Sequence, residues 1–129
     1  MEEIEFLSLE RVIELHTYQV EQFGGDPGIL NRGLLESALA QPGAAFGGSY
    51  LHEDLAAMAA AYLFHICKNH PFADGNKRTA THVAIVSLEL NGHELDVPVD
   101  EAERLVLGVA EGKVAKEEVA RFFRSLMKA

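Results

Sequence analysis

The chain has 129 residues, of which 48% are hydrophobic and 24% charged, and its 20 acidic and 11 basic side chains give a formal net charge of −9. This balance is typical of a globular protein and excludes a disordered acidic chain or a fibre. The length predicts one domain over residues 1–129, without room for a second core. Because an acidic surface repels phosphate polymers and anionic lipid, we expect no nucleic-acid binding by the chain itself and no membrane binding.

Three further features concern the compartment. A lone cysteine, Cys67, cannot form an intramolecular disulfide or a multi-thiolate zinc site, which is compatible with a reducing environment. The segment Met1–Glu5 lacks the positive charge and the apolar run of a secretory signal. The longest weakly polar run, Leu55–Ile66, is shorter than the roughly 20 apolar residues that a membrane span requires. We therefore expect a cytoplasmic protein.

The N-terminal third of the chain predicts two helices. Ser8 is a suitable N-cap for a first helix over residues 9–22, which Gly24-Gly25 ends. Asn31 can cap a shorter second helix over residues 32–40. Both helices therefore begin at a residue whose side chain can accept a hydrogen bond from the first turn.

The segment Gly43–Leu51 predicts an exposed hairpin or flap rather than a buried element. It contains three glycines, with the aromatic residues Phe46 and Tyr50 between them. These two rings either touch a binding partner or simply cover the core, and the sequence favours neither alternative.

Two mostly apolar helices are expected in the middle of the chain. The stretch Glu53–Asn69 is rich in Ala, Leu and Met on nearly every side, as expected of a helix buried in a small bundle, and His70-Pro71 breaks it. A second apolar stretch, Asn76–Leu90, follows and ends at Asn91-Gly92. The short loop between them is therefore held between two buried helices.

The C-terminal region predicts two more helices. Asp100 and Glu103 form the pattern of a capping box for a helix that ends at Glu111. A last helix over about residues 116–127 has a weak start, because Ala115 offers no capping hydroxyl. Short strand signals occur only at Glu5–Leu7 and His93–Val97. The expected fold class is all-α, with about six helices and a short β-flap.

Chemically informative residues are concentrated in the loop between the central helices. Gly75 permits close approach of the backbone, and the first turn of the following helix offers free N–H groups and the positive end of the helix dipole. Lys77 and Arg78 add positive charge suited to phosphate oxygens. Asp74 suits Mg²⁺, which is commonly bound by one or two carboxylates together with phosphates and water. The loop therefore predicts a site for a polyphosphate with Mg²⁺.

His70 is the candidate general base of this site. An imidazole can accept a proton from an attacking hydroxyl near neutral pH. His70 follows the C-terminal end of a helix, where the dipole favours the protonated form, so we expect its placement to matter more than a low pKa. Taken singly, each of these loop residues is explained by a turn or a solvated surface, but their combination favours a functional site.

The stretch His70–Arg78 reads HPFADGNKR and resembles the signature loop of the Fic/Doc family, H-P-F-x-[DE]-G-N-[GK]-R. The stretch from Gly24 to Pro42 is similar to the N-terminal signature of the death-on-curing (Doc) branch. The resemblance covers essentially the whole chain. It implies an all-α Fic fold in which the loop joins the two central helices and a flap beside it docks the protein target.

The resemblance also implies a role for each loop residue. His70 would activate a hydroxyl of the target, Asp74 would bind Mg²⁺, and Phe72 would anchor the loop in the core. The nucleotide phosphates would be bound by Gly75, Asn76, Lys77 and Arg78. The target-docking flap would include Gly47, Gly48, Ser49, Tyr50 and Leu51.

Two positions bear on the reaction. Adenylyl-transferring Fic proteins typically have glycine where this chain has Lys77 and arginine where it has Thr81, so both differences favour the Doc branch. Resemblance to that branch implies that the γ-phosphate of ATP faces the base and that the protein is a kinase. Gly75 is the Fic-type residue and keeps transfer of AMP as an alternative. A third hypothesis, of another class, is a non-catalytic module that binds nucleotide or partner.

As a member of the Doc branch the protein would be a toxin of a toxin–antitoxin system that arrests translation, with elongation factor Tu as target. The family's autoinhibitory pattern, [ST]-x-x-x-E-[GN], is absent from the sequence. Restraint would then come from a cognate antitoxin whose tail blocks ATP or the target. Although the whole chain is acidic, residues 68–78 carry a net charge of +2 and the others −11. A single phosphate-bearing ligand is therefore compatible with the charge distribution.

Overall fold

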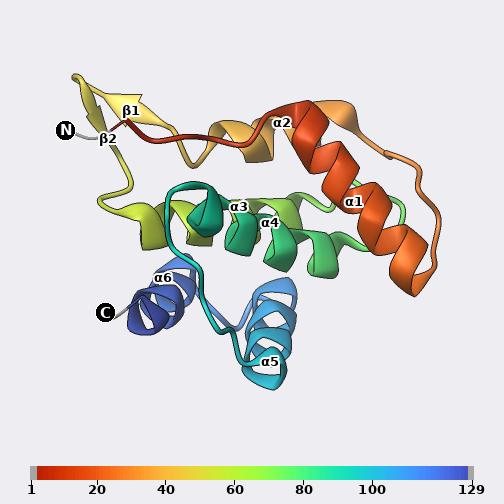
Figure 1. Ribbon diagram of the computed structural model, residues 1–129. Coiled ribbons are helices and arrows are strands. Elements are labelled where there is room, and N and C mark those ends of the chain that lie inside the picture. Colours follow the sequence, from red (N-terminus) through yellow and green to blue (C-terminus); the bar gives the residue numbers. More distant parts are fainter. Residues whose placement is uncertain (1–2, 128–129) are drawn as a thin grey trace.

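The computed structural model describes residues 3–127, which form six α-helices and one small β-hairpin (Figure 1). The elements in chain order are α1 (Leu9–Phe23), α2 (Arg32–Ala40), β1 (Ala45–Phe46), β2 (Ser49–Tyr50), α3 (Leu55–Asn69), α4 (Asn76–Leu90), α5 (Val99–Ala110) and α6 (Lys116–Leu126). The predicted all-α class with a short hairpin is confirmed. Within the described residues, none of these helices combines the length and the apolarity of a membrane span.

The helices α3 and α4 pack against each other in the centre of the molecule. In Figure 1, α1 and α2 lie on one side of this pair, and α5 and α6 lie on the other. The central position explains the composition of α3, whose small and apolar side chains are buried on most of its surface. The largest fully buried side chains include Tyr62, Phe72, Phe123, Leu35 and Leu63.

Local capping signals account for the start of the first two helices. The Ser8 Oγ accepts a hydrogen bond from the Arg11 N–H at 3.1 Å. The Asn31 Oδ1 accepts one from the Leu34 N–H at 2.9 Å, and α2 covers the predicted residues 32–40. Each cap satisfies one of the N–H groups that a helix leaves unpaired at its start, and both predictions are confirmed.

Three details of the sequence-based predictions are wrong. The capping box of Asp100 and Glu103 does not form, because α5 begins at Val99 with Pro98 at the cap position and no side-chain cap. Proline has the φ of a helix start and no N–H to satisfy, so the helix begins at Val99, two residues earlier than a cap at Asp100 predicts. Neither strand signal forms a strand. For Glu5–Leu7 the backbone bonds to side chains instead, with the Leu7 N–H donating to the Tyr62 hydroxyl at 2.9 Å.

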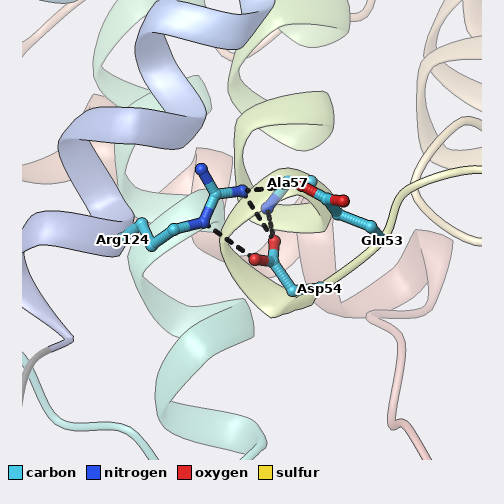
Figure 2. Close-up of polar contacts among 4 residues, drawn as sticks. All are labelled: Glu53, Asp54, Ala57 and Arg124. Atoms are coloured by element: carbon cyan, nitrogen blue, oxygen red, sulfur yellow. Dashed lines mark hydrogen bonds and ion pairs between the residues drawn. The ribbon is translucent and has the colours of Figure 1, made fainter.

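A polar contact fixes the end of α6 to the start of α3 (Figure 2). The Asp54 carboxylate caps α3 by accepting from the Ala57 N–H at 2.8 Å. The same carboxylate accepts from Arg124 at both oxygens, at 2.8 and 3.1 Å. The hydrogen bond from Arg124 is the largest influence on the pKa of Asp54, which lies below its usual value. This contact joins the C-terminal helix to the segment that links the hairpin to α3.

His65 makes the fold sensitive to acid. Burial, followed by the charge of Lys116, lowers its pKa to about 4. Between pH 6.5 and 4 the unfolded chain therefore takes up a proton that the folded protein does not, and stability falls as pH falls. We expect His65→Gln to reduce this loss by about 1 kcal/mol after allowance for solvent screening. Urea unfolding at pH 7 and pH 4.5 measures the loss of stability in the wild-type protein and in the variant. An equal loss in both would show that His65 is not the group responsible.

Candidate active site

The loop at residues 70–75 connects α3 to α4. Pro71 disfavours the helical conformation at the preceding residue, so α3 ends at Asn69. His70 follows in the left-handed conformation, with φ 50° and ψ 55°, and is the one residue other than glycine with positive φ among residues 3–127. Such a conformation costs about 1–2 kcal/mol in a residue with a Cβ atom. The strained backbone therefore belongs to the residue that the sequence predicts as the base, and the side chain of this residue is exposed.

The backbone strain at His70 can be measured. We expect His70→Gly to be more stable than His70→Ala by about 1 kcal/mol, because glycine adopts left-handed angles without penalty. Urea unfolding of the two variants gives the difference. A His70→Ala variant as stable as the glycine variant would show that residue 70 does not adopt this conformation.

A segment between α1 and α2 clamps the loop. The Leu30 and Asn31 N–H groups both donate to the Pro71 carbonyl, at 2.8 and 3.2 Å. The Ala73 N–H donates to the Gly28 carbonyl at 2.9 Å. These bonds make residues 28–31 a short antiparallel partner of the loop, which fixes its backbone from outside.

Asp74 is held by the same segment. Its Oδ2 accepts from the Asp26 N–H at 2.7 Å, and a Cβ on Gly25 would lie 2.9 Å from the Asp74 Cβ. Within the described residues no group donates to the second oxygen, Oδ1, and the side chain is exposed. One oriented carboxylate with a free oxygen fits Mg²⁺ in the presence of phosphates and water. Among the described residues no three potential ligands cluster around a metal position, so the remaining ligands would come from the substrate.

The inner side of the loop rests on three buried side chains. Phe72 is fully buried, and its ring stacks on that of His16 with centroids 3.7 Å apart and planes 8° apart. Asn76, which is 5% exposed, donates to the Phe72 carbonyl at 2.9 Å and accepts from the Phe72 N–H at 3.0 Å. A phosphate contact by Asn76 would therefore come from its backbone N–H.

The loop opens onto a pocket of about 690 Å³ between α1, α4 and α5. The first hydrogen bond of α4 runs from Thr79 to the Gly75 carbonyl, so the N–H groups before Thr79 lie free at the positive end of the helix. The pocket is basic at this end and apolar along α5. The basic end is lined by Gly75, Asn76, Lys77 and Arg78, whose guanidinium lies 4.3 Å from the centroid of the Phe23 ring, and the apolar part includes Val99 and Leu107. Its form suits a ligand with phosphates and an apolar body.

The hairpin lies at the other end of α3. Figure 1 shows it beside the N-terminal end of this helix, whereas the loop follows the C-terminal end, and a helix of 15 residues is about 22 Å long. Gly47 and Gly48 form its turn with φ of 60° and 85°. Tyr50 packs against Phe6 with centroids 5.8 Å apart, while Phe46 is 81% exposed. Of the two rings, only Phe46 thus remains free to meet a partner. The predicted residues of the loop therefore lie together, whereas the predicted flap residues lie at the opposite end of α3.

A family model and two curated relatives match this chain. The model of the Fic/DOC family matches residues 6–88, which is more than half of the chain. The chain belongs to the Fic/DOC family. The matched region runs from the N-terminal segment through α4 and so includes both the loop and its clamp.

Two curated relatives place this Fic/DOC chain in the Doc branch. It is 42% identical over 90 residues to a protein of Mycolicibacterium smegmatis named "Toxin Doc", covering 68% of this chain and 69% of the relative. It is 33% identical over 121 residues to a protein of Escherichia phage P1 named "Protein kinase doc", covering 93% and 94%. The second match extends beyond the family model into the C-terminal helices.

The sequence analysis missed the residues that support the loop of this Fic/DOC protein. Neither His16 nor Asp26 is among the candidate site residues that the sequence indicates. The signal for His16 was available, since it lies four residues after the core residue Val12 and a histidine on a buried face requires a polar partner. No local signal assigns the Asp26 N–H to Asp74, because the two residues are 48 positions apart.

Proposed function

We propose that this protein is a Doc-like toxin that transfers the γ-phosphate of ATP to a hydroxyl group of a protein. The observation that carries the proposal is the oriented Asp74 carboxylate, which directly precedes Gly75 and the free N–H groups of α4 at the basic end of the pocket. This combination suits a Mg²⁺-bound polyphosphate better than any other common ligand. The exposed His70 begins the same loop, four residues before Asp74.

In the proposed reaction, His70 accepts the proton of the target hydroxyl while the oxygen bonds to the γ-phosphorus and the bond to the β-phosphate oxygen breaks. ADP leaves, and the phosphorylated side chain is released. The N–H groups at the start of α4, with Lys77 and Arg78, hold the phosphates and stabilise their charge. Mg²⁺, when bound through Asp74, would neutralise phosphate charge. The clamp keeps these groups in fixed positions, which is the main requirement of phosphoryl transfer.

Phosphoryl transfer is favoured over transfer of AMP by the residues that line the basic end of the pocket. Lys77 adds a cation where adenylyl transferases typically have glycine, and Thr81 replaces a second arginine. The relative that covers 93% of the chain is named a protein kinase. Transfer of AMP stays the second candidate because of Gly75, the Fic-type residue, whose φ of 79° suits glycine.

Labelled ATP separates the candidates. The purified protein is incubated with elongation factor Tu, Mg²⁺ and ATP that is radiolabelled at either the α or the γ position. We expect label on the target from the γ position alone. Label from the α position would show transfer of AMP, and label from neither, in a protein that binds ATP, would favour a non-catalytic binding module.

The partners follow from the same proposal. As a Doc-like toxin the protein acts in the cytoplasm, arrests translation through elongation factor Tu, and is restrained by a cognate antitoxin whose tail covers the pocket. The exposed Phe46 and Leu51, 81% and 64% accessible, give the hairpin an apolar contact for the target. The distance along α3 implies that the target extends from the hairpin to His70.

A further inference from the structure

His16 is a buried polar residue directly beneath the loop. It lies in α1, is 1% exposed, and its Nε2 is 2.8 Å from the backbone carbonyl oxygen of Asp74. A carbonyl can only accept, so the Nε2 must carry the hydrogen. The stacked Phe72 ring fixes the plane of the imidazole and therefore the direction of this bond.

The hydrogen bond determines the orientation of the next backbone N–H. No cis peptide occurs in the structure as described, and in a planar trans peptide the C=O and N–H groups point in opposite directions. With the Asp74 carbonyl turned inward to His16, the Gly75 N–H points outward from the protein interior. Gly75 lines the pocket, and its N–H has no acceptor among residues 3–127.

Without the bond to His16, the peptide between Asp74 and Gly75 would be free to rotate. Glycine tolerates both signs of φ, so rotation of this peptide meets little resistance at Gly75 itself. The rotated peptide would direct the carbonyl oxygen outward in place of the N–H. An oxygen at that position repels a phosphate, whereas the N–H attracts it.

We propose that His16 is a positioning residue that holds the Asp74–Gly75 peptide with its N–H toward the bound phosphates. The inference rests on the proposed function only for the nature of the ligand. It accounts for a fully buried imidazole on the face of α1 that also buries Val12 and Leu15, because a buried polar side chain requires a partner.

Two variants separate the donor from the ring. His16→Phe retains an aromatic ring beneath Phe72 but removes the donor, whereas His16→Gln retains an N–H donor at similar reach but removes the ring. Tyr62→Phe is the matched control, because it also removes one polar group from a buried aromatic residue, here the acceptor of the Leu7 N–H at 2.9 Å. Tyr62 has no contact with the loop residues among the described hydrogen bonds.

The probe is tripolyphosphate with Mg²⁺, titrated into the ¹⁵N-labelled full chain carrying His70→Ala to prevent toxicity. We expect the Gly75 amide proton to shift downfield when the probe binds to the His70→Ala protein. The same shift is expected when His16→Gln or Tyr62→Phe is added to that protein. With His16→Phe we expect the shift to disappear and the affinity to fall about ten- to a hundred-fold, the effect of losing a charged hydrogen bond. Thermal unfolding reports stability separately.

An unchanged Gly75 shift and affinity with His16→Phe would overturn the inference. So would an equal loss of affinity with Tyr62→Phe, since that would show a general effect of destabilisation. If His16→Phe does not fold, the test rests on His16→Gln, which retains an N–H donor. Loss of the Gly75 shift in that variant would contradict a role of the donor. The titration needs no phosphoryl transfer, so failure of the proposed function appears only in the labelling experiment.

Discussion

His70→Ala is expected to abolish modification of the target, with a rate about 10²- to 10⁴-fold lower, while ATP still binds. The imidazole is the group proposed to accept the hydroxyl proton, whereas the groups proposed to bind the phosphates belong to other residues, at Gly75 and in the first turn of α4. The measurement is the rate of label transfer from γ-labelled ATP, together with ATP binding by calorimetry. Expression of the variant in bacteria should no longer arrest growth.

The control is His93→Ala, which removes a partly exposed histidine after α4. It should transfer phosphate at the wild-type rate. Retained toxicity of His70→Ala would contradict catalysis by this residue and favour the binding module. Because His70 is exposed and left-handed, the loss of activity is not expected to come with a loss of stability.

The loop and most helix ends were predictable because their signals are local. A capping side chain bonds within its own first turn, and Pro71 acts on the residue beside it, so a short stretch of sequence contains the interacting groups. The failure at α5 has the same origin, since two valid start signals, Pro98 and Asp100, compete within three residues. The sequence pattern alone does not decide between them.

The support of the loop was not predictable in the same way. His16 meets Asp74 across 58 residues and Asp26 meets it across 48, so the contacts depend on how α1 packs against α4. The position of the hairpin also depends on packing, because it follows from the direction in which α2 runs. Sequence alone therefore identifies the chemical groups of the site, but not what orients them.

This support changes the interpretation of the N-terminal signature. The glycine-rich segment after α1 contains none of the groups proposed to act in the reaction, yet it contacts the loop at every residue from Pro71 to Asp74. A loop between two helices would otherwise be mobile, and phosphoryl transfer requires fixed positions. The segment and the loop therefore act as one unit, which explains why both resemble the same family.

Gly25→Ala tests this unit and should lower the transfer rate about 10²-fold, the effect of a displacement of about 1 Å in a catalytic group. The added Cβ would lie 2.9 Å from the Asp74 Cβ, so the carboxylate must move. We also expect the variant to require a higher Mg²⁺ concentration for half-maximal transfer. The rate measured against Mg²⁺ gives both quantities.

Gly24→Ala is the matched control. Both glycines have positive φ, 85° and 119°, so alanine strains the backbone at either position, but a Cβ on Gly24 meets nothing within 4 Å. Backbone strain should cost both variants stability, about 1–3 kcal/mol, while only Gly25→Ala loses activity. Equal activity in the two would show that Asp74 does not depend on the packing of Gly25. Because both variants strain the backbone, the difference between their activities reports the contact between residue 25 and Asp74.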